Sequence, residues 1–107
     1  MTRVLFDHCV PKPLRIQLPG FEIRTCFEEG WEALRNGELL AAAESAGFQV
    51  FVTADRNLRY QQNLANRSIA IIELPRNRLS LLISLTPAIT QALTSIAPGG
   101  YLEIPMP

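Results

Sequence analysis

Short runs of apolar, β-prone residues alternate with helix-length segments along the whole chain. This alternation is typical of a parallel β-sheet whose strands are joined by helices. It predicts a single α/β domain over residues 1–107, folded as a three-layer sandwich around a mostly parallel sheet of about five strands. The predicted strands cover residues 3–6, 21–26, 48–53, 69–74 and 101–104. The third run is apolar except for Gln49, which indicates a central strand buried on both faces.

Proline, glycine and polar residues mark the ends of the first predicted helices. Proline is favoured in the first turn of a helix, so a helix is predicted to start at Pro11 and to end near Leu18. A second helix is predicted over residues 37–46. Asn36 is its expected N-cap, and Gly47 is its expected C-terminal stop.

The second half of the chain contains three more predicted helical segments. One covers residues 55–64. Apolar residues then recur at helical spacing from 79 to 96, but Pro87 removes a backbone donor inside this pattern. The pattern therefore predicts two helical pieces, with Thr86 as the cap of the second.

Composition and charge limit the classes of function. A 48% hydrophobic content supports a real core, and ten basic residues balance ten acidic ones. Because the net charge is zero, nucleic-acid contacts must be local. Cys9 and Cys26 are too few for a disulfide framework and are expected to be buried or half-buried thiols in a reducing compartment. No secretory leader or bilayer-spanning stretch is apparent, so a soluble cytoplasmic protein is expected.

Two aspartates follow the first and third predicted strands. In a sheet of strand order 2-1-3-4-5, the connections after these strands leave on opposite faces and open a crevice at the carboxyl edge. Asp7 comes directly after the first strand, and Asp55 lies two residues past the third. Since neighbouring strands lie roughly 5 Å apart, these side chains are expected to converge on one ion or on a pair of ions.

Glu38 is a third candidate, because it lies in the first turn of the helix 37–46. The helix dipole also favours a carboxylate there for structural reasons alone. Clustered carboxylates repel one another unless a cation lies between them, and oxygen ligands favour Mg²⁺ or Mn²⁺ over zinc. Such an ion activates water for attack on a phosphodiester. The pattern predicts phosphodiester hydrolysis, with Asp7, Glu38 and Asp55 as catalytic and metal-binding residues.

Three segments, VLFDHCVP at 4–11, NGELLAAAESAG at 36–47 and FVTADRNL at 51–58, resemble the PIN-like nuclease superfamily. The likeness is greatest to its small stand-alone bacterial group, the nucleases of toxin–antitoxin operons. The resemblance implies a divalent-metal-dependent endoribonuclease with Asp7, Glu38 and Asp55 at its site. A toxin role, with an antitoxin protein blocking the crevice, is one hypothesis that the resemblance raises.

The sequence departs from this family pattern after Asp55. PIN-type sites often carry a further acidic residue there, whereas this chain has Arg56 and Asn57. Asn57 offers a neutral oxygen ligand, so a site with a single metal ion is expected. Arg56 and Arg59 are candidate ligands for the phosphates of an RNA substrate. His8 is set aside as a general base, because neighbouring residues at a strand end are expected to point in opposite directions.

Two alternatives stand beside the nuclease, and the first of them is disfavoured. A phosphoacceptor receiver domain also has acidic residues after strands one and three, but it needs an acidic pair at the first position and a lysine after the fifth strand. This chain has Asp7 alone there, and its single lysine is Lys12. The second alternative is a catalytically weakened PIN-like module that binds proteins or regulates them, which the neutral charge and Asn57 favour. The apolar C-terminal helices offer a surface for a homodimer.

Overall fold

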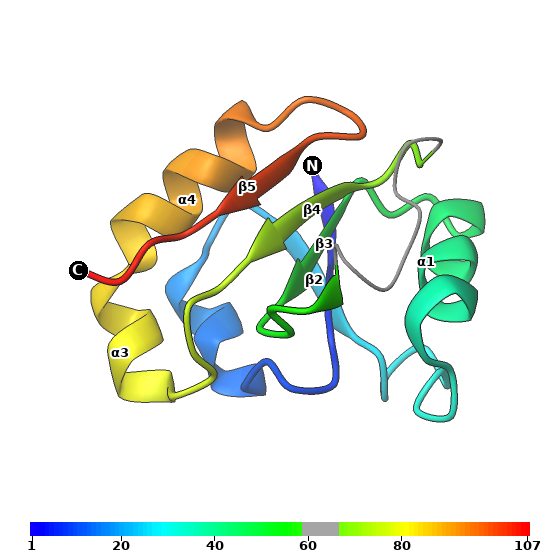
Figure 1. The fold of residues 1–107 in the computed structure, drawn as a ribbon, viewed down its shortest axis with the longest axis horizontal. Coiled ribbons are helices and arrows are strands. Elements are labelled where there is room, and N and C mark those ends of the chain that lie inside the picture. Colours follow the sequence, from blue (N-terminus) through cyan, green and yellow to red (C-terminus); the bar gives the residue numbers. More distant parts are fainter. Residues whose placement is uncertain (59–66) are drawn as a thin grey trace.

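Five short strands, all parallel, form the central sheet of the protein (Figure 1). The computed structural model describes residues 1–58 and 67–107. The strands are β1 (Arg3–Phe6), β2 (Glu22–Thr25), β3 (Val50–Thr53), β4 (Ala70–Glu73) and β5 (Tyr101–Glu103). Their order in the sheet is β2-β1-β3-β4-β5. The five predicted strands and their predicted order are confirmed, although most strands are shorter than the apolar runs that contain them.

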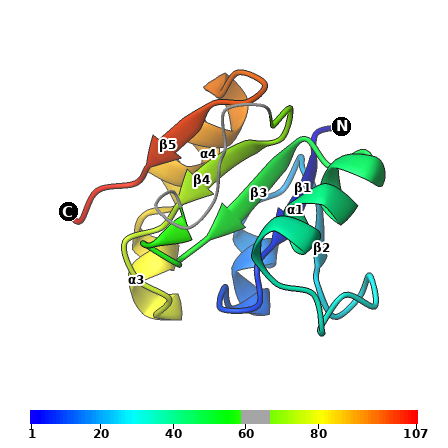
Figure 2. The ribbon, with the colours of Figure 1, turned by 45° about the vertical axis from the view of Figure 1, so that its right-hand side comes forward.

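Helices cover both faces of the sheet and make a three-layer domain (Figure 2). On one face lie the 3-10 helix η1 (Lys12–Gln17) and the α-helices α3 (Leu79–Ser84) and α4 (Thr86–Ser95). On the other face lies α1 (Asn36–Ser45). Every residue of β3 is buried, and its side chains alternate between the two apolar clusters. The prediction of a central strand buried on both faces is therefore confirmed.

The helix predicted over residues 37–46 is present, but its N-cap is not Asn36. Arg35 has the extended backbone of a cap residue (φ −136°, ψ 151°), and Leu39 N donates to Arg35 O (3.4 Å). The first helical turn thus starts one residue earlier than predicted, and Arg35 makes no side-chain capping bond. At the other end, Gly47 has φ +86°, which confirms its predicted role as the stop.

The segment after β1 folds as a 3-10 helix and not as the α-helix that its prolines suggested. Leu14 N donates to Pro11 O and Leu18 N donates to Arg15 O, both at 3.1 Å, which are bonds between residues three apart. Pro11 and Pro13 lack backbone N–H donors, so a longer α-helix would form few additional backbone hydrogen bonds here.

The two helical pieces predicted from residue 79 onward correspond to α3 and α4. Thr86 is the first residue of α4 and not its cap, because Leu85 occupies the cap position. The Thr86 hydroxyl donates instead to Ile83 O of the preceding helix (2.6 Å). The predicted helix 55–64 falls mostly outside the described residues, as does Arg59. Within residues 1–58 and 67–107, no helix has the length and apolar content needed to cross a membrane.

Glu44 fixes the last turn of α1 to the chain that leads into β4. Its carboxylate accepts hydrogen bonds from Arg67 Nη1 (2.9 Å), Ser68 N (2.6 Å) and Ile69 N (3.2 Å). Burial disfavours the charged carboxylate, but these donors outweigh burial, so the pKa of Glu44 lies below its usual value. The charged form of Glu44 therefore stabilises the approach to β4.

Glu44→Gln is expected to lower the free energy of unfolding by about 1–3 kcal/mol at pH 7, because the donors lose a charged acceptor. A carboxyl whose pKa is lowered by folding contributes stability above its unfolded value, and this contribution disappears as the pH falls. The difference in the free energy of unfolding between the wild-type protein and Glu44→Gln should therefore shrink below about pH 4.3. Urea denaturation at several pH values measures it.

The matched control is Glu22→Gln, which removes an exposed carboxylate whose ion pair with Arg3 spans 3.1 Å. Its effect should stay within about 0.5 kcal/mol. Two outcomes would contradict the stabilising role of the charged Glu44 carboxylate. One is an equal loss of unfolding free energy in the two variants, and the other is a loss in Glu44→Gln that persists in acid.

Candidate functional site

A row of polar side chains crosses the carboxyl edge of the sheet on the face that α1 covers. Phe6 pairs with Thr25 in β2 and with Val52 in β3, so the next position aligns Asp7 with Cys26 and Thr53. Thr53 pairs in turn with Glu73 in β4. Strand side chains alternate between faces, and Leu5 and Phe51, two residues before Asp7 and Thr53, pack on the α1 side. The row is therefore Cys26, Asp7, Thr53 and Glu73.

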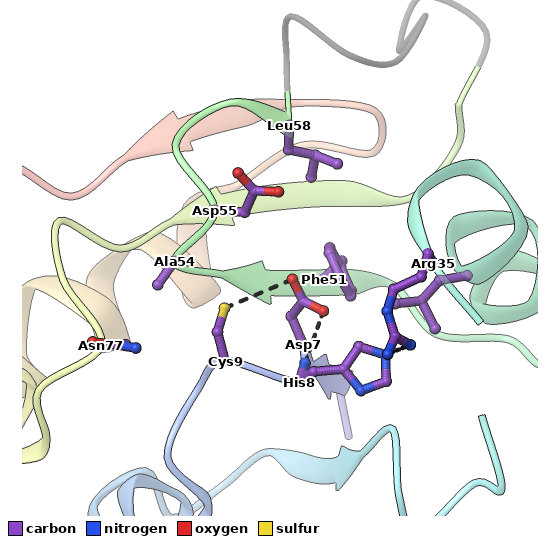
Figure 3. Close-up of a pocket in the computed structure, with 10 residues that line it drawn as sticks. Asp7, His8, Cys9, Arg35, Phe51, Ala54, Asp55, Leu58 and Asn77 are labelled. Atoms are coloured by element: carbon purple, nitrogen blue, oxygen red, sulfur yellow. Dashed lines mark hydrogen bonds between the residues drawn. The ribbon is translucent and has the colours of Figure 1, made fainter. Parts of the chain in front are cut away.

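The Asp7 carboxylate is held by donors at both of its oxygens. Oδ1 accepts a hydrogen bond from His8 N (2.7 Å), and Oδ2 accepts one from the Thr53 hydroxyl (2.7 Å). The Cys9 thiol also approaches Oδ2, at 3.8 Å (Figure 3). The Asp7 backbone N–H continues the β1–β3 ladder by donating to Val52 O (2.9 Å). The orientation of this carboxylate is thus fixed by the sheet.

The Thr53 hydroxyl connects Asp7 to the turn that carries Asp55. Thr53 is fully buried, and its oxygen accepts a hydrogen bond from Asp55 N (3.0 Å) while its proton goes to Asp7. Asp55 Oδ1 accepts in turn from Asn57 N (2.9 Å), which closes the turn after β3. One buried hydroxyl thereby sets the positions of both acidic residues.

Asp7 and Asp55 line the same cavity, which has a volume of about 360 Å³ (Figure 3). Its polar lining residues are Asp7, His8, Cys9, Arg35, Asp55 and Asn77. Apolar side chains such as Phe51 and Leu58 form the rest of its wall. The structure therefore brings together two acidic residues from separate strand ends, with the guanidinium of Arg35 facing the same space.

The other predicted site residues that the structure describes, Glu38, Arg56 and Asn57, do not line this cavity. Glu38 is exposed in the first turn of α1 and does not line the cavity, although Arg35 and Leu39 on either side of it do. Asn57 is exposed, and its backbone N–H donates to Asp55 Oδ1. Arg56 points toward Glu73, with 3.9 Å between Arg56 Nε and Glu73 Oε2.

His8 is a site residue that the sequence argument set aside for a wrong reason. The expected alternation would turn His8 away from Asp7, but both side chains line the cavity. The alternation does not apply because the chain leaves the ladder in a turn directly after Asp7. The position of His8 next to Asp7 was the only available signal. Arg35 and Asn77 carried no sequence signal for this site.

The two cysteines are free, and both lie close to Asp7. Burial raises the pKa of Cys26 to about 12, with a further contribution from the negative charge of Asp7. Burial likewise raises the pKa of Cys9. The Cys26 thiol donates to Phe6 O (3.2 Å). These findings confirm the prediction of buried or half-buried free thiols.

Glu73 is an acidic residue of the row that the sequence analysis did not consider. It is fully buried, and the Tyr101 hydroxyl donates to its Oε1 (2.5 Å). Oε2 has no hydrogen-bond partner among the described residues and faces Arg56. Glu73 does not line the cavity. Its contacts with Tyr101 and Arg56 connect β4 to β5 and to the turn after β3.

Thr53→Val keeps the shape of the side chain and removes its hydroxyl. Because Asp7 Oδ2 and Asp55 N each lose a buried partner, the free energy of unfolding should fall by about 1–3 kcal/mol. Thr94→Val is the control, since the exposed Thr94 hydroxyl only donates to Thr90 O (2.8 Å) within α4; its effect should stay within about 0.5 kcal/mol. Urea denaturation measures both, and equal effects would contradict the bridging role of Thr53.

Comparisons of the chain with protein-family models, with curated proteins and with solved structures gave no match. Function therefore has to be inferred from the residues that line the cavity and from their chemistry.

Proposed function

We propose that this cavity binds one Mg²⁺ or Mn²⁺ ion and that the protein is a metal-dependent endoribonuclease. The observation that carries the proposal is the convergence of Asp7 and Asp55 on one cavity at the carboxyl edge of the sheet. Two carboxylates that share a cavity are stabilised by a cation. The resemblance of three sequence segments to PIN-like nucleases supports the same chemistry.

The residues of the cavity fit a hard cation. Asp7 and Asp55 supply carboxylate oxygens, and Asn77 supplies an amide oxygen on the same cavity. The hydrogen bonds of Thr53 and His8 hold the Asp7 carboxylate in place before any ion binds. Asn57, the residue expected to compensate for a missing acid, is exposed and does not line the cavity. This ligand set suits a single ion that keeps part of its water shell.

A bound ion would supply an activated water and would neutralise charge on the leaving oxygen. The protein contributes a second positive charge through Arg35, which lines the cavity. Arg35 Nη1 donates to Glu32 O (2.5 Å) and Leu34 O (2.8 Å), so the guanidinium is already oriented. A guanidinium in this position can bind a phosphate oxygen of RNA. Arg56 and Arg59 remain proposed contacts for the flanking phosphates.

The biological partners are proposed on the resemblance alone. They are an RNA substrate, an antitoxin protein that covers the cavity, and a second copy of the chain in a homodimer. A non-catalytic module that binds or regulates other proteins is the second candidate function. One observation favours it: neither Glu38 nor Asn57 lines the cavity, which leaves Asp7 and Asp55 as its acidic lining residues.

Asp7→Asn and Asp55→Asn should each lower the rate of Mn²⁺-dependent RNA cleavage by at least about 100-fold, because each removes a charged metal ligand. Glu22→Gln is the control for loss of a surface carboxylate and should leave the rate unchanged. Glu38→Gln should lower it by less than about 10-fold, since Glu38 could act on the ion only through water. Cleavage of a labelled single-stranded RNA measures these rates.

Crystals soaked in Mn²⁺ give an independent readout of the same site. The proposal expects an anomalous peak beside Asp7 and Asp55. Full cleavage by Asp7→Asn would refute the catalytic assignment. A Mn²⁺ peak without cleavage of any RNA tested would favour the non-catalytic module.

A further inference from the structure

Asp7 and His8 lie between two hollows at the carboxyl edge of the sheet. Both residues line the cavity with Asp55, and both also line a second cavity of about 520 Å³. The second cavity is lined by Asp7 and His8 again, together with Cys26 and Lys12 among others. A ligand held by Asp7 and His8 would therefore be reachable from both cavities.

Cys26 completes a group of three metal-ligating side chains at this junction. A carboxylate oxygen of Asp7, a ring nitrogen of His8 and the sulfur of Cys26 all lie within 4.8 Å of one another. The sheet sets this arrangement, because Asp7 and Cys26 follow the paired ends of β1 and β2. Sulfur and imidazole ligands favour Zn²⁺ and similar ions, whereas Mg²⁺ prefers oxygen.

The hydrogen bonds of His8 leave one of its nitrogens available to a cation. His8 Nε2 lies 3.0 Å from Leu34 O and 3.2 Å from Arg35 Nη1. Arg35 Nη1 has two protons, and the carbonyls of Glu32 and Leu34 accept them at 2.5 and 2.8 Å. The tautomer that fits carries its proton on Nε2 and donates it to Leu34 O. Nδ1 then keeps its lone pair, as in metal-binding histidines whose other nitrogen donates to a carbonyl.

Asp7 and Cys26 can also reach a cation without breaking the sheet. Asp7 Oδ1 accepts one hydrogen bond, from His8 N, and keeps a second lone pair. The Cys26 thiol proton is donated to Phe6 O, which is a backbone oxygen at the end of β1. A cation would replace that proton on sulfur, and the proton would leave to solvent without any oxidation or reduction.

We propose that Asp7, His8 and Cys26 form a site for Zn²⁺ or a similar borderline divalent ion, with a fourth position open to the cavities. This site goes beyond the proposed nuclease site and differs from it in ligand type, although the two share Asp7. Occupation by Zn²⁺ would engage the carboxylate that the Mg²⁺ or Mn²⁺ ion needs. Inhibition of cleavage by Zn²⁺ rests on the proposed function, whereas binding of Zn²⁺ does not.

Titration of the reduced protein with Co²⁺ tests the site, because a thiolate ligand gives Co²⁺ a sulfur-to-metal charge-transfer absorption. We expect this band in the wild-type protein, its loss on addition of Zn²⁺, and its persistence in excess Mg²⁺. Cys26→Ser should remove the band. Cys9→Ser is the matched control, since it removes the other free thiol near Asp7, and it should keep the band. His8→Gln should weaken Co²⁺ binding by at least about 10-fold.

The absence of the band, or its loss in Cys9→Ser with retention in Cys26→Ser, would overturn the site. If Cys26→Ser fails to fold, zinc-edge X-ray absorption of the wild-type protein decides the question: one sulfur in the first shell supports the site, and a shell of oxygen alone refutes it. Asp55→Asn separates the two proposals, because it should lose RNA cleavage and keep the cobalt band. A protein that shows the band and cleaves no RNA would keep the zinc site and reject the nuclease.

Discussion

The Thr53 hydroxyl lies 2.7 Å from Asp7 Oδ2 and 3.0 Å from Asp55 N, and the contact with Asp7 depends on the register in which β1 pairs with β3. A shift of this register by one residue would turn one partner to the opposite face of the sheet. The register is itself fixed by the apolar side chains that β1 and β3 bury on both faces. Packing in the interior thus determines the geometry of the polar edge.

Much of the architecture could be predicted from the sequence, because parallel strands buried on both faces appear as continuous apolar runs. Asp7 and Asp55 could likewise be placed at one edge of the sheet, since each follows a recognisable strand. Side-chain directions could not be predicted where the chain leaves regular structure. The direction of His8 depends on the turn after β1, and the direction of Arg56 depends on Glu73, which is buried one strand away. Contacts made in turns or between distant residues leave no periodic pattern in the sequence, so they could not be predicted from it.

Glu38 illustrates a different limit of sequence reasoning. Its place in the first turn of α1 was predicted correctly, but helical spacing alone does not give the rotation of a helix about its axis. In the structure, Arg35 and Leu39 face the cavity and Glu38 is exposed. The side of the helix that meets the sheet is decided by Leu39, Leu40 and Ala43, which pack into the core. The apolar contacts of α1 therefore determine which polar residues reach the edge.

The contacts of Glu73 also bear on the last strand of the sheet. The Tyr101 hydroxyl donates to this buried carboxylate, and Ile104 N donates to Glu73 O (2.8 Å), so β5 is attached to β4 through both side chain and backbone. Without β5, the apolar strand β4 would present unpaired backbone groups at the border of the sheet. Such a border recruits strands from other molecules. The short C-terminal strand thus pairs the backbone groups that the buried strand β4 would otherwise expose at this border.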